Sequence, residues 1–142
     1  MKRPYRNKMD PSKLNFLAIV AAAVAAFVIG GAWYSSALFG KAWMEAAGLD
    51  EKALQTRKMG AVFTVAFLLA LVISANLAAF LQGPPNLAWG IAAGALAGIG
   101  WVATAMGVTY LFEARPLKLF LIDAGYHAFT FMVMGGILGA WK

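Results

Sequence analysis

The spacing of charged residues constrains this chain more than any other feature. No Asp, Glu, Lys or Arg occurs between Lys13 and Lys41, and none occurs between Lys58 and Glu113. A helix needs about 20 apolar residues to cross roughly 30 Å of hydrocarbon. The first gap can therefore hold one membrane-spanning helix and the second can hold two. A fourth span fits in the segment that follows Lys118.

The composition indicates the same class of protein. Of the 142 residues, 62% are hydrophobic and 13% are charged, with a mean hydropathy of +0.72, which is far more apolar than a soluble domain. We predict an all-α fold, an integral membrane four-helix bundle that forms one domain over residues 1–142. The predicted spans cover residues 14–37, 59–81, 87–111 and 117–141. The first uncharged run is too long for the apolar region of a secretory leader, so we expect it to be retained.

Helix start and stop signals divide the chain. Asp10 followed by proline predicts the start of the first helix, and residues 38–49, with Trp43 among them, are typical of an interfacial segment. Asp50 can cap a helix that we expect to run unbroken to Leu81. The sequences QGPPN at 82–86 and EARP at 113–116 predict tight turns. Short turns predict that the second, third and fourth helices are consecutive antiparallel neighbours.

Small residues recur at four-residue spacing on the predicted helices. Such stripes let two helix backbones approach closely. They favour packing within one chain, and contact between subunits is the alternative. The residues concerned are Ala22, Ala26, Gly30, Gly90, Gly94, Gly98, Gly135 and Gly139. Trp33, Tyr34 and Trp43 are predicted interface anchors, because amphipathic rings prefer the boundary between hydrocarbon and headgroups.

The fourth span carries an aspartate and the chain's only histidine, Asp123 and His127. Four-residue spacing puts both on one helix face, and the cost of a charge in lipid predicts that this face points into protein. Asp123 could be protonated, paired with protonated His127, or paired with Arg115 or Lys118. One interpretation is a relay for protons or cations. The other is a hydrogen-bonded link between helices.

The turn before the fourth span gathers three charges, Glu113, Arg115 and Lys118. They could contact a lipid headgroup or a charged partner. The simpler interpretation is that they stop transfer through the membrane and cap the adjoining helices.

Several function classes have little support. The net charge is +6, but the basic residues flank apolar spans and form no polar face for a nucleic-acid backbone. With no cysteine and one histidine, the chain lacks the usual ligands of a zinc site. No phosphate-binding glycine loop or serine elbow is present. We therefore expect no enzymatic activity, no cofactor and no nucleic-acid partner.

The basic residues do not decide the orientation in the membrane. Six lie on the side of the termini (Lys2, Arg3, Arg6, Lys8, Lys13, Lys142) and six on the opposite side (Lys41, Lys52, Arg57, Lys58, Arg115, Lys118). Because the first helix often dominates, we expect both termini in the cytoplasm. The expected location is the bacterial inner membrane.

Two stretches, GAWYSSALFGKAW at residues 31–43 and LFEARPLKLFLIDAGYH at 111–127, carry a family resemblance. Together with Lys58-Met59-Gly60 they resemble the bacterial membrane family catalogued as domain of unknown function 1761, from about Asn15 to Trp141. The resemblance implies a small four-span protein without an assigned activity. In that family proline is common at the position of Ser36 and asparagine at that of Asp123, which lowers the case for proton transfer by this carboxylate.

These observations favour a small structural or accessory membrane subunit. It would associate with membrane lipids and act as a homo-oligomer or within a larger membrane complex. The rival hypothesis is a transporter or channel for protons, cations or a small solute that uses Asp123 and His127. A third is lipid binding at the Arg115 turn.

Overall fold

A computed structural model describes residues 9–142, and in these residues every regular element is helical. Lys2, Arg3, Arg6 and Lys8, which entered the orientation argument, lie outside the described residues. The elements in chain order are η1 (Pro11–Lys13), α1 (Phe16–Trp33), α2 (Gly40–Ala47), α3 (Glu51–Gln55), α4 (Met59–Phe80), α5 (Leu87–Ala97), η2 (Gly98–Ala103), α6 (Thr104–Phe112) and α7 (Leu117–Ala140).

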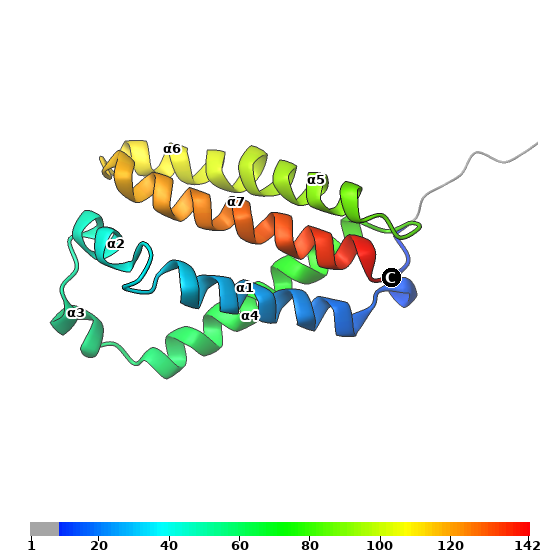
Figure 1. Cartoon of the computed structure of the whole chain (residues 1–142), viewed down its shortest axis with the longest axis horizontal. Helices are drawn as coiled ribbons and strands as arrows, with labels where there is room; N and C mark the ends of the chain where they lie inside the picture. The colour runs from blue at the N-terminus through cyan, green and yellow to red at the C-terminus, as the bar shows by residue number, and fades with distance from the viewer. Residues whose placement is uncertain (1–8) are drawn as a thin grey trace, which may run out of the picture.

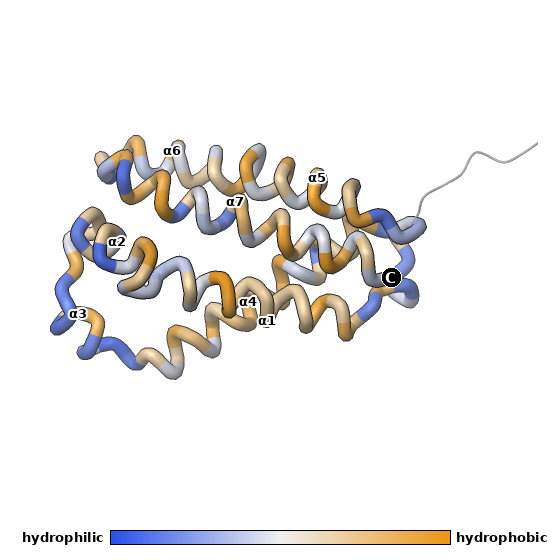
Figure 2. The backbone as a smooth tube through the Cα atoms, in the orientation of Figure 1, coloured by the Kyte–Doolittle hydropathy of each residue, from blue (hydrophilic) through white to orange (hydrophobic). Residues whose placement is uncertain are grey.

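Four helical segments are long and apolar enough to cross a membrane, which confirms the predicted class. They are Phe16–Trp33, Met59–Phe80, Leu87–Phe112 and Leu117–Ala140, and the third combines α5, η2 and α6. Hydrophobic colour follows these helices, while hydrophilic colour gathers at the two ends of the molecule (Figure 2). Many large apolar side chains on the outer faces are exposed, as lipid-facing side chains are in a membrane protein.

α7 is the central helix. In its most apolar 18-residue window 50% of the residues are buried, against 28%, 22% and 17% for the first three spans. It lies between α1 on one side and the continuous α5–α6 rod on the other, and runs antiparallel to both (Figure 1). Every other span is thus positioned mainly by its contact with α7 or α1.

Two predicted helix boundaries are wrong. The Asp10 carboxylate caps only the short turn η1, where its Oδ1 accepts from the Ser12 backbone N–H at 3.0 Å. α1 starts later, with the Asn15 side chain accepting from the Ala18 N–H at 3.1 Å. The rod expected from Glu51 to Leu81 is also broken, because α3 ends at Gln55 and α4 starts at Met59. Lys58, the residue before α4, has no side-chain cap hydrogen bond.

The predicted neighbour order is only half right. α7 packs against α5 as expected, but α4 packs on α1 and more lightly on α7, with little contact to α5. α4 crosses α1 obliquely (Figure 1). At the crossing the buried Ser74 hydroxyl donates to the Ile19 carbonyl at 2.8 Å. Towards the start of α4 the Phe27 ring packs edge-on against Phe67, with ring centroids 5.4 Å apart.

Glycines bring α5 and α7 into backbone contact. A Cβ added at Gly94 would overlap the Phe131 carbonyl oxygen, and one at Gly90 would overlap that of Gly135. At Gly139 an added Cβ would lie 2.7 Å from the Gly90 Cα. We call this set the glycine contact; its members are Gly90, Gly94, Gly98, Gly135 and Gly139. It is formed within one chain, so it no longer supports an oligomer contact.

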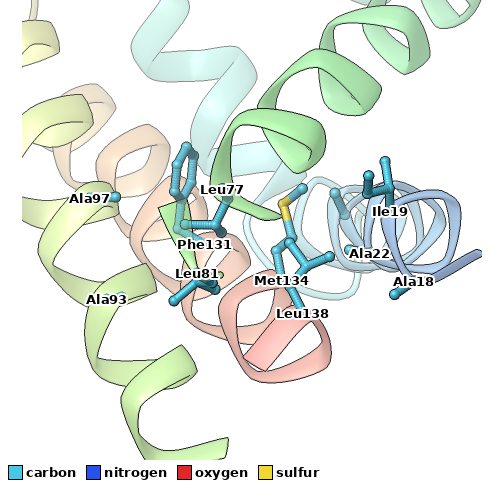
Figure 3. Close-up of a cluster of buried hydrophobic side chains, with 11 residues drawn as sticks. Ala18, Ile19, Ala22, Leu77, Leu81, Ala93, Ala97, Phe131, Met134 and Leu138 are labelled. Carbon is cyan, nitrogen blue, oxygen red and sulfur yellow. The ribbon is translucent and has the colours of Figure 1, made fainter. Parts of the chain in front are cut away.

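Small residues of α1 also lie inside the chain. Ala18, Ala22 and Ala26 are 0%, 0% and 4% exposed. Figure 3 shows Ala18 and Ala22 beside Met134 and Leu138 of α7. This stripe therefore gives α7 close access to α1, and α4 closes the cluster with Leu77 and Leu81.

Hydrogen bonds fasten the chain ends to the α4–α5 turn. The Gln82 side chain pairs with the Asp10 backbone, accepting from its N–H at 3.0 Å and donating to its carbonyl at 2.8 Å. The Asn86 N–H donates to the Gly139 carbonyl at 2.7 Å, and the Lys142 ammonium donates to the Leu81 carbonyl. This end of the molecule is thus closed by contacts among three segments that are distant in sequence.

Candidate functional site

The two stretches that carry the family resemblance meet in space between α1 and α7. A Cβ at Gly30 would lie 3.2 Å from the Tyr126 hydroxyl oxygen, and one at Gly125 would lie 3.2 Å from the Trp33 ring. The Trp33 indole N–H donates to the Ile122 carbonyl at 3.1 Å. Each glycine therefore leaves room for an aromatic ring from the opposite helix.

Asp123 lies at the centre of this contact and is only 8% exposed. Its Oδ1 accepts from the Tyr34 hydroxyl at 2.7 Å, and its Oδ2 accepts from the Tyr110 hydroxyl at 2.9 Å. Phenols are protonated at neutral pH and can donate. We call Asp123, Tyr34 and Tyr110 the tyrosine site. It links the end of α1, α6 and α7 through one carboxylate.

A tight turn after α1 sets the position of Tyr34. The Phe39 N–H donates to the Trp33 carbonyl at 3.0 Å, and the Gly40 N–H donates to the Ser35 carbonyl at 2.9 Å. A Cβ at Gly40 would collide with the Tyr34 carbonyl oxygen, so only glycine fits this close approach. α2 then returns over the site, and Trp43 packs edge-on against Tyr34 with ring centroids 5.5 Å apart. Trp33, Tyr34 and Trp43 thus contact protein, in addition to any role at the lipid interface.

Tyr110 reaches Asp123 because the third span contains a π-helical turn, η2. In a regular α-helix the face that carries Gly94 and Gly98 would return near residues 105 and 109. Both of those residues are exposed, and Tyr110 faces α7 instead. A π turn inserts about one extra residue into the helix. That residue rotates α6 and brings the Tyr110 hydroxyl to the carboxylate.

His127 does not pair with Asp123. Among the described residues neither an ion pair nor a hydrogen bond connects the two side chains; the His127 ring instead lies 5.0 Å from the Tyr126 ring, centroid to centroid. The Tyr126 hydroxyl donates to the Ala26 carbonyl at 3.3 Å. Thr130, 4% exposed, has a buried hydroxyl without a partner in residues 9–142. The carboxylate and imidazole are therefore on one helix but in separate contacts.

The basic residues expected to reach Asp123 are bound elsewhere. The Lys118 ammonium pairs with the Glu45 carboxylate of α2 at 2.9 Å, and the Arg115 Nε pairs with the Glu113 carboxylate at 3.0 Å. A shallow open depression of about 580 Å³ lies between these groups, lined by residues 45–48 and 113–116. Glu113 and Arg115 thus line a concave surface at the same end of the molecule as the tyrosine site, and Lys118 reaches its rim through Glu45.

The polar contacts of α7 are confined to one half of the helix. Past Thr130 its buried residues are Phe131, Met134, Gly135, Gly136, Leu138 and Gly139, which carry no polar side-chain atom capable of proton transfer. No three of the His, Asp and Glu side chains within residues 9–142 come together as metal ligands would. The tyrosine site can hold a carboxylate and orient three helices. Buried polar side chains of α7 lie only in the half of the helix that includes this site.

Residues 17–139 match the model of the family described as "Protein of unknown function (DUF1761)". The chain belongs to this family. No curated protein and no solved structure matches it. The family match covers α1 through α7, so it includes the tyrosine site, the glycine contact and the depression.

Reasoning from sequence identified Asp123 in this family member but missed Tyr110. The sequence predicts Tyr34 only as an interface anchor beside Trp33, and it gives no sign that the Tyr34 hydroxyl donates to Asp123. In a regular helix the face that carries the glycines at 90, 94 and 98 would include residue 109 and not Tyr110. The π turn η2 changes this, so residue 109 is exposed and Tyr110 faces α7. Gly98-Ile99-Gly100 before a tryptophan was the only local hint of irregular helix.

Proposed function

We propose that this protein is a small structural or accessory membrane protein that works by lateral association, through the exposed face of α4. Within the described residues α4 contacts mainly α1 and more lightly α7, and its last residue, Phe80, packs edge-on against Trp101 with ring centroids 5.9 Å apart. Its outer face carries the exposed residues Val65, Leu68, Leu69, Val72 and Asn76. The partner would be a second copy of the chain or a larger membrane complex.

Asn76 is the observation that supports this proposal most directly. Its side chain is exposed, and in the described part of the chain its one hydrogen bond is from Nδ2 to the Val72 carbonyl of its own helix, at 2.8 Å. The carboxamide oxygen and one N–H remain free. Asn76 lies four residues before the end of α4, roughly 6 Å along the axis. Polar groups at such a depth normally face protein, because lipid offers them no partner.

The proposal is tested by the mass of the particle in a mild detergent. We expect a multiple of the 15.1 kDa chain or a co-purifying partner, and we expect Asn76→Leu to shift the population towards single chains. Thr64→Val is the matched control, because Thr64 is exposed on the same helix and its hydroxyl already donates to the Gly60 carbonyl at 2.8 Å. A wild-type particle with one chain and no partner would exclude this function.

Transport of protons, cations or a small solute is the second candidate. The buried carboxylate of Asp123 favours it, whereas the apolar half of α7 gives a proton no next station on that helix. The test is pH-dependent flux into proteoliposomes. Flux that Asp123→Asn abolishes would support transport, and flux that this variant leaves unchanged would remove Asp123 from the mechanism.

A further inference from the structure

We propose that the depression between α2 and the α6–α7 turn binds a zwitterionic headgroup with a primary ammonium and a phosphate, as in phosphoethanolamine lipids. The depression lies where α2 and α6 end and α7 begins, at the same end of the molecule as the tyrosine site. Segments that join membrane-spanning helices lie at the level of lipid headgroups. A volume of about 580 Å³ is in the usual range of small-molecule sites.

The acceptors in the depression favour an ammonium group. Glu45 and Glu113 line it and each uses one carboxylate oxygen, Oε2, in its ion pair. Their Oε1 atoms have no hydrogen-bond partner in the described residues. α2 and α6 also end here, and the C-terminal end of a helix carries partial negative charge. A cation in the depression would therefore face two carboxylates and two helix ends.

The donors next to these acceptors fit a phosphate. Arg115 lines the depression and uses only its Nε within the described residues, so both Nη groups are free to donate. Lys118 uses its ammonium for Glu45 and retains further N–H groups. The Arg115 and Lys118 side chains are 46% and 54% exposed, so a ligand can reach both. Guanidinium and ammonium groups are the usual phosphate ligands of proteins.

The lining distinguishes a primary ammonium from a trimethylammonium group. Quaternary ammonium groups are recognised by the faces of aromatic rings. Residues 45–48 and 113–116 are Glu, Ala, Ala, Gly and Glu, Ala, Arg, Pro, without an aromatic residue. Carboxylate oxygens instead require N–H donors, which ethanolamine has and choline does not. The site should therefore prefer ethanolamine over choline headgroups.

The test uses the full chain and counts lipids retained on it by native mass spectrometry. The protein is equilibrated in micelles with equal amounts of phosphatidylethanolamine, phosphatidylcholine and phosphatidylglycerol of one acyl composition. We expect phosphatidylethanolamine to be retained at least about threefold over each of the others, the scale of one exposed ion pair. Equal retention of the three lipids, or preference for phosphatidylglycerol, would overturn the proposal.

Variants assign the preference to the depression. Glu113→Gln should remove most of the preference over phosphatidylcholine, and Arg115→Gln should weaken retention of both zwitterionic lipids. Lys52→Gln is the control, because Lys52 is at the same end of the molecule but outside the lining. An unchanged preference in Glu113→Gln would exclude this site.

A displacement experiment distinguishes the lipid from its free headgroup. Soluble phosphoethanolamine at the lipid concentration should not displace the lipid. Full displacement would show that the free compound is the ligand and overturn the lipid assignment.

Discussion

The C-terminal half of α7 touches α5 through its backbone, whereas the N-terminal half is held by side chains from the end of α1 and from α6. Along the C-terminal half, glycines of α7 meet glycines of α5, and an added Cβ at Gly94 or Gly135 would overlap a carbonyl oxygen. Along the N-terminal half, Asp123 accepts from Tyr34 and Tyr110, and Trp33 donates to the helix backbone. The π turn η2 separates the two halves on the opposing span.

This difference shows that one helix can use two ways of packing with opposite tolerances. A backbone contact requires glycines without a Cβ atom, so any larger residue pushes the two helices apart. A hydrogen-bonded contact depends on a donor and an acceptor, which a chemically similar group can replace. Substitutions in the two halves of α7 should therefore differ in both size and kind of effect.

The largest effect is expected at the glycine contact. Gly94→Leu would force the α5 backbone away from Phe131, since the collision is with backbone and not with a flexible side chain. Overpacking of this kind should lower the free energy of unfolding by about 3 kcal/mol or more. Denaturant unfolding in micelles, followed by tryptophan fluorescence, measures it. Gly100→Ala on the same span has open space around the new Cβ and should change stability by less than about 0.5 kcal/mol.

A smaller effect is expected where the two halves meet. Deletion of the exposed Ile99 would convert η2 to regular helix and rotate α6 by about 100°, which turns Tyr110 away from Asp123. Loss of that hydrogen bond to a buried carboxylate should cost about 1.5–3 kcal/mol. A double-mutant cycle with Tyr110→Phe tests the cause. If Tyr110→Phe costs as much in the deleted chain as in the full chain, the π turn does not position Tyr110.

At the tyrosine site, removing a donor should cost more than replacing the acceptor. Tyr34→Phe leaves one oxygen of a buried carboxylate unpaired and should lower stability by about 1–2 kcal/mol. Asp123→Asn keeps one oxygen that can accept from a tyrosine, so its cost should be smaller. Thermal unfolding of both variants in one detergent checks it, and a larger loss in Asp123→Asn would contradict it.

The smallest effect is expected outside α7, at the crossing of α1 and α4. Ser74→Ala removes the hydrogen bond from the Ser74 hydroxyl to the Ile19 carbonyl but leaves the Ile19 carbonyl in its helix. Polar contacts between membrane helices average about 0.6 kcal/mol, and we expect a loss of that size. Denaturant unfolding measures the loss, and an effect equal to that of Gly94→Leu would show that α4 is held as tightly as α5.

Much of the fold follows from the sequence by simple rules. Charge-free gaps locate the spans, the turn predicted at QGPPN ends with Asn86 capping α5, and the glycine period marks the face of α5. The glycine period could not say which helix covers that face, since contact with α7 or with another subunit requires the same small residues. The contact between α4 and α1 depends on Phe27, Ser74 and the oblique crossing, none of which has a periodic signal.

The sequence predicts the central residue of the tyrosine site, Asp123, but not the tyrosines that donate to it. A carboxylate in an apolar span must face protein, and Asp123 does. Its spacing from His127 suggested a pair, but helix position alone does not set where two side chains point. The tyrosines come from a turn that depends on Gly40 and from a π turn, and both are departures from regular helix that a period cannot predict.

The unequal attachment of α4 has a consequence for how the molecule opens. Beyond its last turn, Gln82 is tied to the Asp10 backbone by two hydrogen bonds, while before its first turn residues 56–58 form a link without helix and Lys58 supplies no cap. Amide protons of α4 should therefore exchange with solvent in a gradient, fastest near Met59 and slowest near Leu77. A lateral gap towards the lipid would then form first on the side of the membrane where α3 lies.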